Sequence, residues 1–189
     1  WWEQFGENGK ESNALELYRL ALVAGDKEIA CEIAQELTHH YVNSSQFQRA
    51  SMMAKQTIAK VGGTYQIFHA LARAEQALGE TNSALKSYKE ADKHCPLTEV
   101  RDLAAIKHNW AGLCARHGDT NKALELVVQS KELFKQSGSQ EDESASLHTM
   151  GYIHNQRGEI NEAEKFFEEA RQLAEACGYK QGCARALRE

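Results

Sequence analysis

Apolar residues recur every three or four positions in four stretches of the chain, and polar residues fill the intervals between them. The recurring apolar positions are Ala34, Leu37 and Tyr41; Phe68, Leu71 and Ala74; Ile106, Trp110 and Leu113; and Leu147, Met150 and Ile153. This spacing places the apolar side chains on one face of an α-helix. The sequence therefore predicts four amphipathic helices, each with a buried and a solvent-facing side.

A second pattern follows each of these stretches, and one further copy precedes them. In this pattern Gly or Ser is followed by Ala five residues later. A large or apolar residue stands four positions after the alanine, and a small residue stands three positions further on. The copies are Gly9-Ala14-Tyr18-Ala21, Ser45-Ala50-Ala54-Thr57, Gly79-Ala84-Tyr88-Ala91, Gly118-Ala123-Val127-Ser130 and Gly158-Ala163-Phe167-Ala170, and their first alanines lie 36, 34, 39 and 40 residues apart. Such regular offsets predict an internal repeat of two helices.

The Gly or Ser is expected to form the turn within each repeat. Glycine adopts the left-handed backbone conformation that ends a helix more readily than other residues do. Thr120 and Asn121, which come shortly after Gly118, are expected to cap the helix that follows, because their side chains can accept from its first N–H groups.

These repeats resemble the tetratricopeptide repeat, a helix-turn-helix unit of about 34 residues. The resemblance is strongest in the last copy, with Leu147, Met150 and Gly151 before the turn and Ala163, Phe167 and Ala170 after it. Three positions depart from the family pattern, namely Trp110, Ala111 and Ala54. The resemblance implies an all-α fold, a right-handed α-solenoid of about five units. The longer repeats of this chain, with spacings of 39 and 40 residues, resemble the extended repeats of helical regulators and adaptor proteins.

We expect one solenoid over residues 1–189 with no domain boundary. Its units are 1–28 (partial), 29–63, 64–97, 98–138, 139–178 and 179–189, the last being the start of a further repeat. Both end units are incomplete, whereas a solenoid normally ends in a polar capping helix. The sequence is therefore expected to be a segment of a longer protein.

Composition agrees with a helical protein and excludes several classes. The chain contains 26 alanines against 20 Val, Ile and Thr residues together, and only one proline. No run approaches the roughly 18 consecutive apolar residues that a membrane helix needs. The net charge of -5 gives no field to attract nucleic acid. We therefore expect neither membrane nor nucleic acid as a partner.

The cysteines predict an intracellular, cytoplasmic protein. Cys31, Cys95, Cys114, Cys177 and Cys183 are odd in number and form no CxxC pair, unlike the framework of a small secreted protein. Cys177 and Cys183 flank Gly178 and are interpreted as free thiols, with a disulfide as the alternative.

In the implied solenoid the first helices line a concave groove that binds a peptide or a helix of a partner. The polar positions facing this groove are predicted to be Gln35, His39, Asn43, His69, Arg73, Gln76, His108, Arg116, His148, Tyr152 and Asn155. Three successive units carry histidine at one position, which predicts a row of His69, His108 and His148. With Arg73 and Arg116 nearby, the groove is expected to favour acidic segments, and more so at low pH. The alternative is that these residues only solvate a helix face.

Catalytic and metal signals are fragmentary. Cys114 and His117 are three residues apart, but Cys114 falls on the packing side, where a thiol acts as a small hydrophobe. His39, His40 and His69 lack the spacing of a known zinc motif. Recognition of RNA needs a basic groove, and Arg73, Arg116 and Lys107 are opposed there by Glu32, Glu36 and Glu75. We expect no enzyme activity, no cofactor and no metal.

The sequence thus predicts a non-catalytic protein-interaction scaffold. The alternative is a sensor or regulatory segment of a larger signalling protein, such as an ATPase switch or a transcription regulator, whose contact is an effector domain in its own chain. The groove lacks the Lys and Asn arrangement with which chaperone adaptors of the family hold a terminal carboxylate, so a chaperone tail is disfavoured as the partner.

Overall fold

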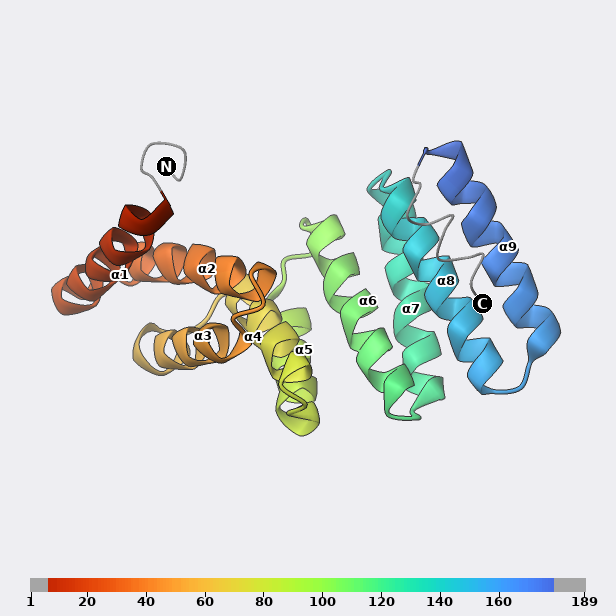
Figure 1. Cartoon of the computed structure of the whole chain (residues 1–189), viewed down its shortest axis with the longest axis horizontal. Helices are drawn as coiled ribbons and strands as arrows, with labels where there is room; N and C mark the ends of the chain where they lie inside the picture. Colours follow the sequence, from red (N-terminus) through yellow and green to blue (C-terminus); the bar gives the residue numbers. More distant parts are fainter. Residues whose placement is uncertain (1–6, 179–189) are drawn as a thin grey trace. The chain divides into compact units, whose positions relative to one another are not determined.

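The computed structural model describes the backbone of residues 7–178 and the side chains of residues 11–178. Within these ranges the chain forms nine helices and no strand (Figure 1). They are α1 (Glu7–Ala24), α2 (Lys27–Asn43), α3 (Phe47–Val61), α4 (Tyr65–Ala77), α5 (Thr81–His94), α6 (Val100–Arg116), α7 (Thr120–Gln136), α8 (Gln140–Gln156) and α9 (Ile160–Ala176). The predicted all-α fold of helix-turn-helix repeats is confirmed. None of the described helices is both long and apolar enough to cross a bilayer.

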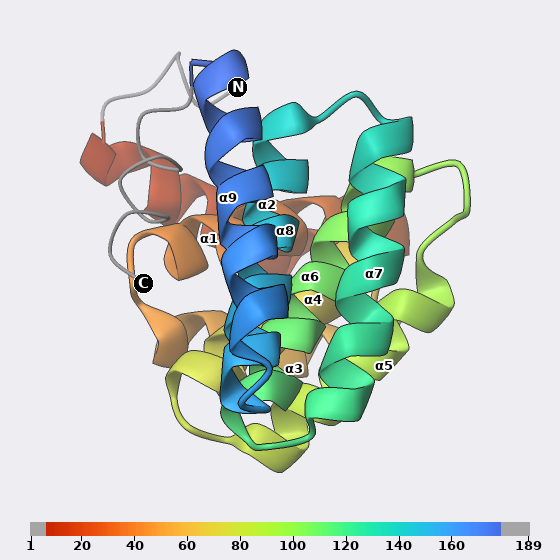
Figure 2. The same cartoon turned by 90° about the vertical axis from the view of Figure 1, so that its right-hand side faces the viewer.

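The helices pack in pairs that follow the chain. The described chain divides between His94 and Cys95 into two compact units. In the first unit α2 packs on α3 and α4 packs on α5, and α1 lies against α2. In the second unit α6 packs on α7 and α8 on α9, and Figure 2 shows α9 running beside α8. One such pair lies within each of the ranges 64–97, 98–138 and 139–178, whereas the pair of α2 and α3 begins at Lys27, two residues before the predicted range 29–63. The single continuous solenoid stays a prediction, and the range 179–189 lies outside the described residues.

The turns within the pairs share one backbone geometry. Ser45, Gly79, Gly118 and Gly158 have φ of 60°, 78°, 82° and 77°. After each of them the next N–H donates to a carbonyl five residues earlier, as in Gln46 to Tyr41 at 2.7 Å. This bond closes the helix in the manner of a Schellman motif, which needs a left-handed residue. The prediction for these four turns is confirmed.

Two details of the predicted turns are wrong. Gly9 lies inside α1 and not in a turn. Glycine costs only about 1 kcal/mol in a helix interior, so packing along the rest of α1 outweighs its preference. The cap of α7 is Asp119, whose carboxylate accepts from the N–H of Lys122 at 3.1 Å, and not Thr120 or Asn121. Asp119 directly follows Gly118, so its side chain reaches the first free N–H groups of the helix.

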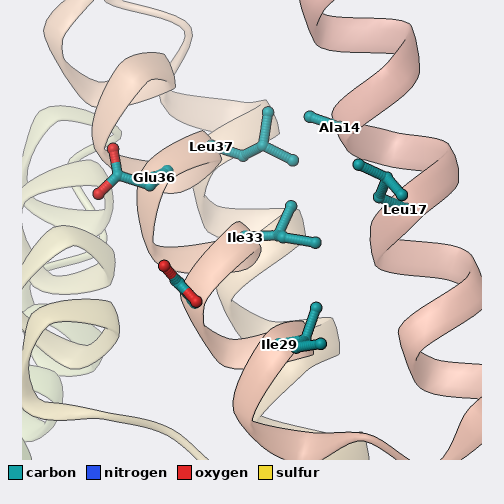
Figure 3. A pocket seen from close by; sticks show the side chains of 7 residues that line it. Ala14, Leu17, Ile29, Ile33, Glu36 and Leu37 are labelled. Carbon is teal, nitrogen blue, oxygen red and sulfur yellow. The ribbon is translucent and has the colours of Figure 1, made fainter. Parts of the chain in front are cut away.

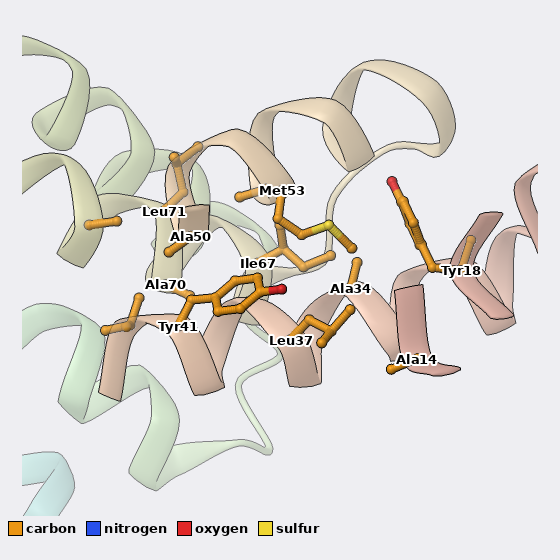
Figure 4. Close-up of a cluster of buried hydrophobic side chains, with 14 of the residues drawn as sticks. Ala14, Tyr18, Ala34, Leu37, Tyr41, Ala50, Met53, Ile67, Ala70 and Leu71 are labelled. Carbon is orange, nitrogen blue, oxygen red and sulfur yellow. The ribbon is translucent and has the colours of Figure 1, made fainter. Parts of the chain in front are cut away.

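Alanine, leucine and tyrosine form the core of the first unit. Small side chains such as Ala34 and Ala50 are fully buried and let neighbouring helices approach closely, while Leu37 and Ile67 fill the space beside them (Figure 4). The Tyr18 hydroxyl lies 3.0 Å from Thr57 Oγ1, so α1 and α3 are also joined by a buried hydrogen bond.

The core of the second unit repeats the same scheme with leucine, isoleucine and valine. Its large, fully buried residues come from all helices except α9, and they are Ile106, Leu113, Leu126, Val127 and Ile153. On α9 the small residues Ala163, Ala170 and Ala174 are buried instead. The repeated alanines of the sequence pattern are thus the positions of close helix contact.

Candidate functional site

All eleven predicted groove residues lie on the first helices of the pairs. Gln35, His39 and Asn43 are on α2; His69, Arg73 and Gln76 on α4; His108 and Arg116 on α6; and His148, Tyr152 and Asn155 on α8. Their spacing of three, four or eight residues keeps them on one side of each helix. We call these eleven residues the first-helix face.

In the first unit, residues of the first-helix face on α2 and on α4 contact each other. His39 and Asn43 are exposed, and Gln35 and Arg73 are partly buried. Arg73 Nη2 donates to Asn43 Oδ1 across the two helices at 3.5 Å. The structure therefore brings together two of the predicted residues that lie 30 positions apart in the chain. A guanidinium and an amide side by side can bind a carboxylate or a backbone carbonyl.

Two other residues of the face on α4 hold a buried tyrosine. Gln76 Oε1 accepts from the Tyr88 hydroxyl at 3.0 Å, and the His69 ring lies 6.1 Å from the Tyr88 ring. Tyr88 is fully buried, whereas His69 and Gln76 are partly exposed. Both side chains therefore have a packing role in addition to any role toward a partner.

In the second unit, Arg116 and Asn155 are exposed and Tyr152 is partly exposed. The Tyr152 hydroxyl accepts from Gln156 Nε2 at 2.9 Å. His108 Nδ1 lies 3.2 Å from Ser146 Oγ on α8, and its ring lies 6.4 Å from that of Phe134. These contacts draw His108 toward the interface between α6 and α8.

The three histidines at the repeated position share one kind of contact. The His148 ring lies 5.2 Å from the Phe167 ring on α9, as His69 contacts Tyr88 and His108 contacts Phe134. Each histidine thus packs on an aromatic ring of the second helix in its own pair. His69 belongs to the first unit and the other two to the second, so the continuous row stays a prediction.

Glu75 was expected on the groove face, and this is wrong. Its side chain is only 2% exposed and accepts from Ser87 Oγ at 2.7 Å. Lys55 Nζ on α3 lies 3.1 Å from the same carboxylate. Glu75 points into the junction of α3, α4 and α5 because a cation and a hydroxyl there compensate its buried charge.

The Cys114–His117 pair does not have the properties of a nucleophile. Cys114 is buried, and burial raises the pKa of its thiol to about 11. His117 is exposed beyond the C-terminal end of α6. A catalytic cysteine needs a lowered pKa, because the thiolate is the reactive form.

The metal hypothesis has no support in geometry. Among residues 11–178 no cluster of three or more His, Cys, Asp or Glu side chains lies close enough to hold an ion. Cys177 is an exposed free thiol, and Cys183, its alternative disulfide partner, lies outside the described part of the chain.

Sequence reasoning missed a pocket between α1 and α2. Its volume is about 530 Å³ and its lining residues are Ala14, Leu17, Ile29, Glu32, Ile33, Glu36 and Leu37 (Figure 3). The apolar row Ile29, Ile33 and Leu37 was visible in the sequence at a spacing of four residues. Only the structure shows that part of the pocket stays uncovered, since Ile29 is 48% exposed and Leu17 on α1 is 41% exposed, whereas Leu37 is fully buried.

Comparison with known proteins agrees with the repeat. Residues 102–176 match the sequence model of the tetratricopeptide repeat family. No curated protein sequence matches the chain. BtubC (BKLC) from P. vanneervenii is similar in structure, with a TM-score of 0.74, 20% identity, and coverage of 90% of this chain and 76% of that one.

Two further solved structures are similar. YrrB, described as a TPR protein with an unusual peptide-binding site, has a TM-score of 0.66 at 14% identity and covers 93% of this chain and 84% of its own. A signal transduction ATPase with a tetratricopeptide repeat sensor, from Pyrococcus horikoshii, has a TM-score of 0.71 at 15% identity. It covers 91% of this chain, which spans 28% of that protein. At these identities the likeness shows the fold, and the resemblance inferred from the sequence is confirmed.

Proposed function

Because the chain has the fold of tetratricopeptide-repeat proteins and residues 102–176 match that family's sequence model, we propose that it is a non-catalytic scaffold for protein interaction. It binds a peptide or a helix of a partner on the first-helix face. The observation that carries this proposal is the position of the polar residues. In both units the first helices present polar side chains at least partly to solvent, while their opposite sides form the core.

The composition of the exposed part points to the chemistry of the partner. Arg73, Asn43 and His39 in the first unit, and Arg116 and Asn155 in the second, supply hydrogen-bond donors and two guanidinium groups. Such groups recognise carboxylates and backbone carbonyls. We therefore expect the bound segment to be polar or acidic.

A peptide array tests this proposal. The native chain is compared with His39→Ala/Arg73→Ala in the first unit and with Arg116→Ala/Asn155→Ala in the second. Lys86→Ala/Lys89→Ala is the matched control, because both lysines are exposed on α5, a second helix. Binding to acidic peptides that weakens in either face variant and not in the control supports the proposal. Equal binding by all variants would move the site away from the first helices.

The role of the histidines needs a separate measurement. Because His69, His108 and His148 contact aromatic rings, glutamine is a better replacement than alanine, since it keeps a polar side chain and removes the titration. Peptide affinity is measured at about pH 6 and about pH 7.5, on either side of the usual histidine range. A gain in affinity at the lower pH that disappears in the triple glutamine variant assigns recognition to the histidines. An unchanged pH profile leaves them a packing role.

The alternative function is a regulatory segment of a larger signalling protein. The structural similarity to the repeat sensor of an ATPase from Pyrococcus horikoshii favours it, and so do the spacings of 39 and 40 residues. In that case the main partner is an effector domain of the same protein. The absence of any bound peptide at either pH, in a chain shown to be folded, would favour this alternative.

A further inference from the structure

We propose that a hollow where the ends of α1, α2 and α3 meet binds a short acidic segment of a partner protein that carries one large apolar side chain. The hollow has a volume of about 410 Å³, within the range of about 300–1,000 Å³ typical of binding sites. Its lining residues include Arg19, Leu22, Val23, Lys27, Lys60 and Val61, and all six are exposed or partly exposed. We call these six residues the basic hollow. Each of them can be reached by a partner from solvent.

The basic hollow lies away from the first-helix face. Its walls come mainly from the C-terminal ends of α1 and α3, which both carry the second-helix pattern of the repeat. The buried hydrogen bond between Tyr18 and Thr57, at 3.0 Å, joins these two helices. Lys27 is its only residue on a first helix, and it lies at the opposite end of α2 from His39 and Asn43. The walls of the basic hollow are therefore complete within the described residues.

Charge indicates an anionic ligand. Neither Lys27 nor Lys60 has an ion pair or a side-chain hydrogen bond within the described part of the chain. Arg19 is paired with Glu16 on its own helix through Nε and Nη2, at 2.9 and 2.7 Å, which leaves the N–H groups of Nη1 available. The carboxylate of Asp26 already accepts from a backbone N–H of α2 at 3.1 Å. Cations that line one hollow repel each other, and bound carboxylates would relieve that repulsion.

The position of Lys27 favours the same ligand. Lys27 is the first residue of α2, where the positive end of the helix dipole disfavours a cation. The other first helices, α4, α6 and α8, begin with uncharged residues, so the repeat does not require a lysine there. Lys60 is in the last turn of α3, where the dipole favours a cation. An anion in the hollow would interact favourably with Lys27 and with the dipole of α2 together.

The apolar part of the hollow indicates an apolar side chain beside the carboxylates. Val23 is 76% exposed, and Leu22 and Val61 are partly exposed. Covering these three side chains with a leucine of the partner would remove apolar surface from water. A segment in which a leucine stands between glutamates satisfies both the apolar residues and the lysines of the hollow.

The test uses a short fluorescent peptide, capped at both ends, in which one leucine lies between glutamates. One comparison peptide has glutamine in place of every glutamate, and the other has serine in place of the leucine. Binding to the native chain is measured by fluorescence anisotropy at low and high salt. We expect the glutamate peptide to bind, more weakly at high salt, and the glutamine peptide to bind at least about fivefold more weakly.

Variants of the two unpaired lysines test the charge. Lys27→Gln/Lys60→Gln should weaken binding of the glutamate peptide at least about fivefold. The matched control is Lys86→Gln/Lys89→Gln, which removes two exposed lysines of α5 and makes the same change in net charge. Lys27→Glu/Lys60→Glu should lose the glutamate peptide and bind a peptide with lysine in place of glutamate more tightly than the native chain does. Circular dichroism confirms that each variant is folded.

A substitution of the exposed valine tests the apolar contact. Val23→Ser should weaken binding of the glutamate peptide about threefold and leave the binding of the serine peptide unchanged. The matched control is Val128→Ser, which replaces a half-exposed valine of α7.

Several outcomes would overturn the proposal. They are a glutamate peptide that does not bind, equal binding of the glutamine peptide, and an equal loss in the control variants. Binding that does not need the leucine and is displaced by inorganic phosphate would show a site for simple anions. Self-association abolished by Val23→Ser would assign the hollow to a second copy. A loss in His39→Ala/Arg73→Ala but not in Lys27→Gln/Lys60→Gln would assign the peptide to the first-helix face. The two sets of variants change different residues, so the two proposals fail independently.

Discussion

Gly151 offers a sharp test of how the helices of the second unit pack. It lies inside α8, and a Cβ atom added there would be 2.7 Å from both Cδ1 and Cε1 of Phe167 on α9. Replacing a mid-helix glycine with alanine normally stabilises a helix by about 1 kcal/mol. Here the Phe167 ring must shift, and overpacking costs about 1–3 kcal/mol. We therefore expect Gly151→Ala to lower the free energy of unfolding by about 1 kcal/mol.

Gly112 is the matched control on α6. A Cβ atom there meets only the end of the Arg116 side chain, at 3.7 Å, which is an ordinary contact. Gly112→Ala should therefore raise the free energy of unfolding by about 1 kcal/mol through helix propensity alone. Both substitutions replace glycine with alanine at similar positions along their helices. Opposite signs of the change in the free energy of unfolding would therefore isolate the contact with Phe167.

Urea denaturation followed by circular dichroism measures both effects. Phe167→Leu in the Gly151→Ala background should recover part of the loss, because a smaller side chain leaves room for the new methyl group. The reasoning would be refuted if Gly151→Ala were as stabilising as Gly112→Ala, or if Phe167→Leu lowered stability equally with Gly and with Ala at position 151.

Three further predictions concern single side chains. Thr38 is fully buried and its hydroxyl has no hydrogen-bond partner in the described structure. Thr38→Val should therefore raise the free energy of unfolding by about 1 kcal/mol in the same urea assay. Thr57→Val, which breaks the hydrogen bond to Tyr18, should lower it. Ser45 has φ of 60°. Ser45→Gly should stabilise the chain by about 0.5 kcal/mol, because relief of the strain in the left-handed conformation exceeds the entropy that glycine adds to the unfolded chain. A loss of stability would contradict this. Burial raises the pKa of Cys114 to about 11, so its thiolate fraction at about pH 8 is roughly a hundredfold below that of an ordinary thiol. Peptide mapping after alkylation should therefore find Cys177 modified long before Cys114.

The predicted site was only partly accessible to sequence reasoning. The choice of the first helices followed from the resemblance to the tetratricopeptide repeat. The apolar periodicity then indicated which of their positions are polar, since residues three and four apart share a face. The periodicity says nothing about how far a long side chain bends toward a neighbour. His108 bonds to Ser146, 38 residues away, and Gln76 bonds to Tyr88. These choices depend on hydroxyl groups supplied by other helices.

The departure from the family pattern at Ala54 acquires a reason only from packing. Gly151 leaves room for the large ring of Phe167, and the corresponding positions of the α2–α3 pair carry the larger Thr38 and the smaller Ala54. Ala54 is fully buried, as is Thr38. The volume of a buried site is shared between two helices, so a small residue on one is compatible with a larger residue on the other.

The sequence by itself determined the helices, their order and four of their turns, because these depend on local features: apolar spacing, alanine at fixed offsets, and a residue at each turn that adopts a positive φ. The tertiary structure alone decided that Glu75 is buried beside Lys55, that Gly9 continues a helix, and that Ile29 and Leu17 border an open pocket. Each of these outcomes depends on which distant side chains surround a residue, and no local pattern contains that information.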